Sequence, residues 1–136
     1  MKALDIDSQP CLIHTAGTPK AVLIQLTARH ERKTIDSELS LIEQGSQMGF
    51  VFVGIDLQQW ALSLMPWADE AVARDPEVGR HAIDTLDYVT RRLLPYIYNR
   101  YGQLPCILGG YSLGGLFSLW AASECPLFDA VAAGSP

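Results

Sequence analysis

Charge is sparse in this sequence, and no run of lysine or arginine occurs. Charged residues make up 18% of the 136 residues, and acidic side chains outnumber basic ones by 15 to 10. Nucleic acids and anionic membrane surfaces are bound through clustered basic side chains. We therefore expect neither as a partner. Small neutral or polar molecules suit this charge balance better.

Cysteine is also scarce, and its spacing indicates neither a metal site nor a disulfide framework. Cys11, Cys106 and Cys125 are odd in number, at spacings that match neither a zinc site nor a set of disulfides. The first residues do not resemble a signal peptide, because acidic side chains occur within the first seven positions. The sequence thus predicts a reduced, cytoplasmic protein.

A charge-free stretch over residues 101–123 is long enough to span a bilayer. Pro105 and several glycines break it into short pieces, and no cationic flank follows it. We therefore expect no membrane span. With 49% hydrophobic residues, the chain instead fits one folded domain over residues 1–136.

The hydrophobic pattern alternates between strands and helices. Nearly continuous apolar runs predict buried strands, and apolar residues at helical spacing predict the segments between them. The expected strands cover residues 21–26, 50–55, 105–110 and 130–133, and the expected helices cover 34–49, 75–101 and 113–123. Two short apolar runs within residues 3–14 predict an antiparallel pair. The fold class is therefore α/β, a mostly parallel sheet with flanking helices.

Three local signals refine these segments. Thr34 is predicted to cap the first helix, and Asp75 followed by Pro76 is predicted to start the second. Pro95 lies inside that second helix and should kink it. Residues 57–74, which carry Trp60 and Trp67, are expected to form a long loop with a short helical turn, and such loops tend to be functional.

The sequence GGYSLGG carries the chemistry. Gly110, Ser112 and Gly114 fit the pattern G-x-S-x-G between a predicted strand and a predicted helix. Glycines there allow a sharp turn that exposes the serine hydroxyl in a strained backbone conformation. The N–H of Leu113 would then form half of an oxyanion hole. The alternative is a tight turn with a structural serine.

The stretches GGYSLGGLFSLWAA and LFDAVAAGSP resemble the esterase family of the α/β-hydrolase fold, which includes carboxylesterases, S-formylglutathione hydrolase and siderophore esterases. The segment from Trp60 to Trp67 is similar to a tryptophan and proline loop in one bacterial branch. The resemblance covers most of this chain but only the amino-terminal part of such an enzyme. It implies a partial α/β-hydrolase domain that is incomplete at its C-terminus.

The resemblance implies serine-dependent hydrolysis of a carboxylic ester or thioester, with Ser112 as nucleophile and a small-molecule ester as substrate. It implies no metal and no organic cofactor. In this fold the acid and the histidine follow the serine along the chain. No histidine follows Ser112, and Asp129 is expected to be a helix-to-strand boundary residue. The alternative function is a catalytically incomplete remnant that serves as a binding or self-associating module.

Further residues are candidates for this site. The second oxyanion donor should follow the strand 21–26, at Thr27 or Ala28. His30 is the histidine placed to approach Ser112, as a base or a substrate contact, with Asp56 as a partner to test. Trp60 and Trp67 are expected either to line an acyl pocket as substrate contacts or to cover the hydrophobic core.

The remaining histidines and the last strand complete the expectations. His14 is expected in a strand, and His81 on a solvated helix face. The strand 130–133 should lie at an edge of the sheet, where no lysine or proline blunts it. This 136-residue form is therefore expected to form a homo-oligomer through this edge, to aggregate, or to be a fragment of a larger folded protein.

Overall fold

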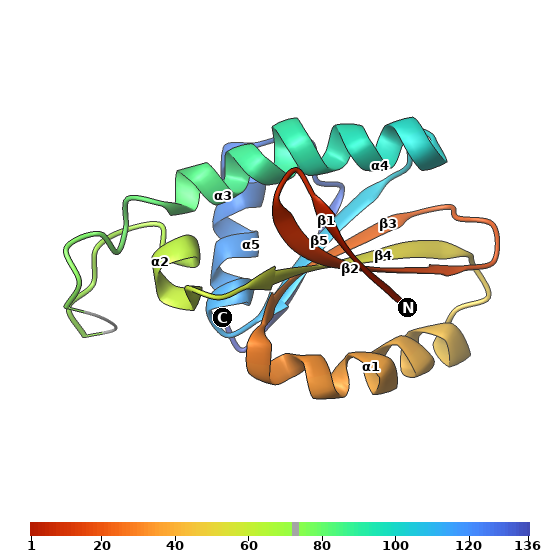
Figure 1. The fold of residues 1–136 in the computed structure, drawn as a ribbon, viewed down its shortest axis with the longest axis horizontal. Helices are drawn as coiled ribbons and strands as arrows, with labels where there is room; N and C mark the ends of the chain where they lie inside the picture. The colour runs from red at the N-terminus through yellow and green to blue at the C-terminus, as the bar shows by residue number, and fades with distance from the viewer. Residues whose placement is uncertain (72–73) are drawn as a thin grey trace.

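The strands form one mixed sheet in the computed structural model, which describes residues 1–71 and 74–136 (Figure 1). Within these residues six strands lie in the order β1-β2-β4-β3-β5-β6. They are β1 (Lys2–Ile6), β2 (Gln9–Ala16), β3 (Val22–Ala28), β4 (Phe50–Leu57), β5 (Cys106–Tyr111) and β6 (Ala130–Gly134). β1 pairs antiparallel with β2 and β2 with β4, whereas β3 to β6 are parallel. The predicted fold class is confirmed.

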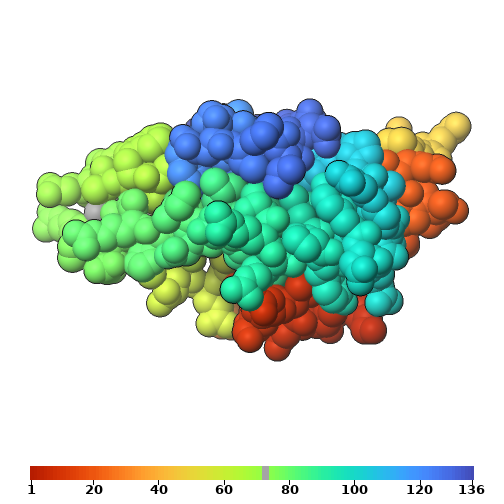
Figure 2. Space-filling model, turned by 90° about the horizontal axis from the view of Figure 1, so that it is seen from above, coloured from red at the N-terminus to blue at the C-terminus, as the bar shows by residue number. Residues whose placement is uncertain are grey.

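Helices cover both faces of this sheet. They are η1 (Arg29–Glu31), α1 (Arg32–Gly45), α2 (Trp60–Leu64), α3 (Ala82–Tyr88), η2 (Val89–Leu93), α4 (Leu94–Tyr101) and α5 (Leu113–Glu124). α1 lies on one face, and the α3 to α4 segment lies with α5 on the other (Figure 1). Figure 2 shows α3 and α4 flanked by α5 on one side and by the hairpin of β1 and β2 on the other. No helix in the described part of the chain is both long and apolar enough to cross a bilayer.

Strand β4 shows how alternation builds two cores. Val51, Val53 and Ile55 belong to the large hydrophobic cluster shared with α3, α4 and α5. Phe50 and Phe52 point the other way, into a smaller cluster with α1. Successive side chains of a strand face opposite sides, so an unbroken apolar run is what a strand covered on both faces requires.

The parallel strands place three connections at one edge of the sheet. β3 leads into η1, β4 leads towards α2, and β5 leads into α5 at Ser112. Because the strands are parallel, their carboxyl ends meet at the same edge, where α/β proteins usually bind ligands. The candidate residues after these strands therefore gather in one region.

The predicted cap of the first helix is wrong. α1 begins at Arg32, directly after the 3-10 turn η1, so Thr34 lies inside the first turn. Its hydroxyl donates to the carbonyl of Glu31 (2.9 Å) instead of accepting an amide hydrogen as a cap would. The helix also ends at Gly45, so Met48 lies beyond it and is exposed.

The predicted start of the second helix is also wrong. α3 begins at Ala82, and Asp75 accepts the N–H of Glu77 (2.9 Å) within a turn. Gly79 adopts a φ of 98°, which is not helical, and an added Cβ there would lie 2.4 Å from the nitrogen of Ala68. A tertiary contact thus overrides the local signal. Of the predicted loop, residues 72–73 lie outside the described residues.

Pro95 disturbs the long helix through a π-helical turn. The segment from α3 to α4 contains the π-helix η2, in which the N–H of Leu94 donates to Val89, five residues earlier. Proline has no N–H of its own, and wider turns are a common way to satisfy the backbone near it. Pro95 then stands in the first turn of α4, where no N–H is needed.

Candidate active site

Ser112 occupies a strained turn between β5 and α5. Its φ of 59° and ψ of −117° lie outside the common regions of the backbone map. The residue is exposed, directly after Tyr111 at the end of β5. The predicted backbone conformation is confirmed. Strain of this kind costs about 1–3 kcal/mol and clusters at functional sites.

Glycines allow the strand and the helix to approach each other at this turn. A Cβ added at Gly110 would lie 2.7 Å from the carbonyl carbon of Gly114. One added at Gly115 would lie 3.0 Å from the carbonyl oxygen of Gly134, at the end of β6. The close approach leaves room for hydrogen alone at Gly110. Gly115 and Gly134 extend the glycine pattern beyond the expected motif.

Backbone groups also hold the turn. The N–H of Ser112 donates to the carbonyl of Gly134 at 2.7 Å, and the carbonyl of Ser112 accepts the N–H of Leu116 at 3.0 Å. Leu113 is the first residue of α5, so its N–H has no partner within the helix. This N–H therefore remains available beside Ser112.

The end of β3 presents one backbone amide towards Ser112. The N–H of Val22 donates to Pro105, just before β5, at 2.8 Å. Backbone groups of a strand alternate between its neighbours, so Ala28 faces the β5 side and Thr27 faces β4. The pairing of β3 with β5 ends at Leu26. Of the two predicted positions, the structure turns only the amide of Ala28 towards the serine turn, beyond the ladder.

His30 lies in η1, on a groove beside the serine turn. The groove has a volume of about 480 Å³. It is lined by Gln25, His30, Glu31, Thr34, Glu38, Gly109, Gly110, Tyr111 and Ala132. Partial burial raises the pKa of the Glu31 carboxyl above its ordinary value. The structure thus brings the predicted His30 to the same groove as the last residues of β5.

Asp56 is bound to arginine and not to His30. Its Oδ2 lies 3.5 Å from Nη1 of Arg32, at the start of α1. The other oxygen, Oδ1, is buried without a hydrogen-bond partner among the described residues. The suggested pairing of His30 with Asp56 is not found among the described residues, where Asp56 contacts Arg32 at the start of α1 instead.

The remaining titratable candidates each contact another group of the protein. His14 contacts Glu43 at 2.5 Å, and His81 lies between Glu77 and Asp84. Asp129 accepts the N–H of Cys106 through Oδ2 at 2.8 Å. These contacts agree with the expected boundary role of Asp129 and the expected strand position of His14. His81 immediately precedes α3.

The two tryptophans of the long loop differ. Trp60 begins α2 and packs half-buried against the large hydrophobic cluster. A Cβ added at Gly114 would lie 3.2 Å from Cη2 of Trp60. Trp67 is 50% exposed, and its backbone is what approaches Gly79. The structure therefore places Trp60, and not Trp67, in contact with the helix that follows Ser112.

Sequence reasoning missed the glycine carbonyl that holds Ser112 and the contact between Trp60 and Gly114. Gly134 could have been found as the glycine that ends an alanine-rich strand, which often marks a close backbone approach. The contact of Trp60 joins positions 54 residues apart in the chain. No local pattern indicates it.

The strand order and the serine turn at the carboxyl end of β5, between β3 and β6, define the α/β-hydrolase fold. The sequence model of the family described as "Putative esterase" matches residues 43–136. The chain belongs to this esterase family. No curated protein sequence matches it.

Solved structures share the fold at low sequence identity. Enterochelin esterase from Shigella flexneri aligns with a TM-score of 0.68 and 20% identity, over 98% of this chain and 36% of that one. Siderophore hydrolase EstB from Aspergillus nidulans aligns with a TM-score of 0.60 and 18% identity, over 95% of this chain and 54% of that one. The chain thus spans a third to a half of the length of these enzymes.

Proposed function

We propose that this chain carries the nucleophile of a serine esterase that acts on carboxylic esters or thioesters, with Ser112 as that nucleophile. The backbone conformation of Ser112 carries the proposal. A serine at φ 59° in a glycine-lined turn, between a buried strand and a helix, exposes its hydroxyl above the sheet. A structural serine has no need of such strain.

The chemistry follows from the groups around the turn. The Oγ of Ser112 attacks the carbonyl carbon of the ester, and a bond forms between them. The bond from that carbon to the alcohol oxygen breaks, so the alcohol leaves. The N–H groups of Leu113 and Ala28 are the donors for the developing oxyanion, and removing one such donor typically costs about 100-fold or more in rate.

The base is the group that these residues supply least well. His14 and His81 are bonded to carboxylates elsewhere, and His30 has no carboxylate hydrogen-bond partner among the described residues. A catalytic histidine needs a group that orients it. When the 136-residue chain acts by itself, the proton of Ser112 therefore passes to a base of the buffer solution. We expect slow acylation of Ser112 and little turnover of the acylated chain.

Mass spectrometry tests the proposal directly. The chain is incubated with p-nitrophenyl acetate, and the acetyl group is located by peptide mapping. We expect one acetyl group on Ser112, with release of one equivalent of p-nitrophenolate. Ser112→Ala should remove both signals.

Ser123→Ala is the matched control. Ser123 lies on the same helix, is exposed, and donates to the carbonyl of Trp120. Its loss should leave acetylation unchanged. Equal labelling of the wild type and Ser112→Ala, or labelling spread over lysines alone, would show that Ser112 is not an activated nucleophile.

The names of the similar structures suggest first substrates. One is named an enterochelin esterase and another a siderophore hydrolase. Siderophore esters are therefore proposed for trial beside simple aryl esters. His30 remains a proposed substrate contact, because it lines the groove that also contains Gly110 and Tyr111. Trp67 is proposed as a second contact only from its place on the segment that follows β4 and α2.

A further inference from the structure

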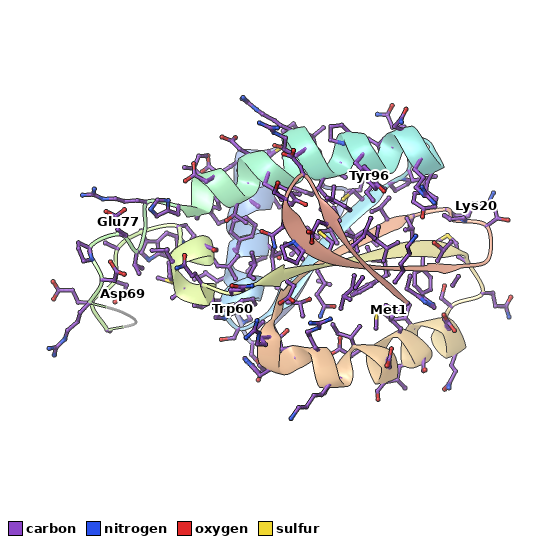
Figure 3. The ribbon with its side chains drawn as sticks, viewed as in Figure 1. Met1, Lys20, Trp60, Asp69, Glu77 and Tyr96 are labelled. Carbon is purple, nitrogen blue, oxygen red and sulfur yellow. The ribbon has the colours of Figure 1, made fainter. Side chains whose placement is uncertain are left out.

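Trp60 is fixed in place by the short helix that it begins. The hydroxyl of Thr85, on α3, donates to the carbonyl of Ser63 at 2.7 Å and ties α2 to the long helical segment. Leu64 and Met65 at the end of α2 are fully buried. The backbone that carries Trp60 is thus anchored at its far end, and its side chain packs against the large hydrophobic cluster (Figure 3).

The tip of the Trp60 ring lies where two backbone segments meet. A Cβ built on Gly114, in the first turn of α5, would lie 3.2 Å from Cη2 of Trp60 and 3.3 Å from the carbonyl oxygen of Leu26. Leu26 is near the end of β3, two residues before Ala28. The ring tip therefore lies against the first turn of α5, at the point where Gly114 itself packs on the end of β3.

We propose that Trp60 is a positioning residue, which sets the distance between the amides of Leu113 and Ala28. This inference rests on the proposed function, since these amides matter only if Ser112 is acylated. Trp60 touches neither the ester nor Ser112 in this role. It acts as a rigid stop against the first turn of α5, which carries the Leu113 donor and packs on β3 at Leu26, two residues before Ala28.

An oxyanion hole depends on the exact position of its donors, so a residue that holds one of them in place affects the rate. Its donors must lie about 2.7–3.1 Å from the developing charge, and a displacement of about 1 Å can lower a rate about 100-fold. A smaller side chain at this position would let the first turn of α5 shift relative to β3 by a part of that distance. Ester binding before the reaction should be affected far less.

Trp60→Leu tests the positioning role of Trp60. The pseudo-first-order rate of Ser112 acetylation is measured at increasing concentrations of p-nitrophenyl acetate, and the limiting rate is separated from the half-saturating concentration. We expect the limiting rate to fall about tenfold or more, with the half-saturating concentration within about twofold of the wild type. Rates are expressed per folded molecule, with the folded fraction taken from urea denaturation followed by far-ultraviolet circular dichroism.

Trp120→Leu is the matched control. Trp120 lies on the same helix α5, is half-buried against the same cluster, and stacks 5.6 Å from the ring of Phe117. It should lose stability, as a truncated core tryptophan does. Its limiting acetylation rate per folded molecule should stay unchanged.

A second pair of variants tests the contact itself. Gly114→Ala adds a methyl group against the ring tip and should also slow acetylation. Trp60→Phe shortens the side chain and leaves a gap there. The double variant should be faster than Gly114→Ala alone, because the shorter ring makes room for the added methyl. This non-additivity reports direct contact.

The outcomes separate the two proposals. Absence of wild-type acetylation at Ser112 would overturn the proposed function and this inference with it. Normal acetylation in the wild type, with Trp60→Leu matching Trp120→Leu in limiting rate, would overturn the positioning role alone. So would a purely additive double variant. A tenfold loss specific to Trp60→Leu, with rescue in the double variant, supports it.

Discussion

At the residue scale, main-chain contacts hold Ser112 in its strained conformation. The carbonyl of Gly134 accepts its N–H at 2.7 Å, and Gly110 and Gly114 meet without side chains between them. A positive φ at serine costs about 1–3 kcal/mol. The packing of α5 onto β5 and β6 offsets it, because the first turn of α5 is buried at Gly114 and Gly115. The conformation therefore depends on β6 as much as on the motif.

His81 gives a residue-scale prediction about pH. Its Nε2 lies 2.9 Å from Glu77 and its Nδ1 lies 3.0 Å from Asp84. Carboxylates only accept hydrogen bonds, so both ring nitrogens must carry protons to satisfy these contacts. The contact with Glu77, and then that with Asp84, raises the pKa of His81 above its ordinary value of 6.5.

Proton NMR of the ring checks this prediction. The His81 pKa should exceed 6.5, and Glu77→Gln and Asp84→Asn should each lower it, Glu77→Gln more. Asp87→Asn, one turn further along α3 and nearest to Arg91, is the control and should change little. Because the pKa is raised on folding, the stabilisation is complete below the unfolded pKa and is lost as pH rises through the folded pKa. An unchanged titration in Glu77→Gln would contradict the contact.

At the element scale, Asp129 joins the starts of two neighbouring strands. Its Oδ2 accepts the N–H of Cys106, and its own N–H donates to the carbonyl of Cys106, both at 2.8 Å. Burial, and then the nearby Asp129, raises the pKa of the Cys106 thiol to about 12, so this thiol stays protonated. Asp129 thus sets where β6 begins beside β5.

Asp129→Ala should destabilise the fold. It leaves the N–H of Cys106, a fully buried residue, without its acceptor, which typically costs about 1–3 kcal/mol. Asp129→Asn keeps an acceptor oxygen and should recover most of this loss. Urea denaturation measures both variants. Equal destabilisation by alanine and asparagine would mean that the charge, and not the hydrogen bond, matters.

Elements also show what the sequence could predict. The strands were predictable because burial on both faces demands unbroken apolar runs, as in β4. The turn at Ser112 was predictable because its glycines are adjacent in the chain. The start of α3 was not, since Gly79 packs on the backbone at Ala68, and this contact outweighs the local signal at Asp75. Trp60 reaches Gly114 through the fold alone, so no pattern foretold it.

At the scale of the whole molecule, cover over the sheet is uneven. α1 packs over β2 and β4, and α5 packs over β5 and β6. The side chains of Ala130 and Ala132 are exposed on the face of β6 opposite α5. Among the described residues, β6 pairs only with β5. The N–H of Ser112 bonds to Gly134, so alternate residues, Val131 and Ala133, direct their amides away from the sheet.

We expect this edge to pair with a second copy of the chain. An edge strand of alanine and valine, without lysine or proline, is a template for strand addition. Sedimentation velocity of the 136-residue chain at micromolar concentration should show a dimer or larger species.

Two edge variants and one control decide between pairing and general stickiness. Ala133→Pro removes an outward amide and no bond to β5, while Ala132→Lys adds an exposed charge beside the edge. Both should sediment as monomers. Ser123→Lys places the same charge at an exposed position of α5 instead of on β6, and this variant should still associate. Backbone amides that have no partner in the sheet should find one in another copy of the chain. A wild-type monomer at every concentration would therefore show that the edge is already protected.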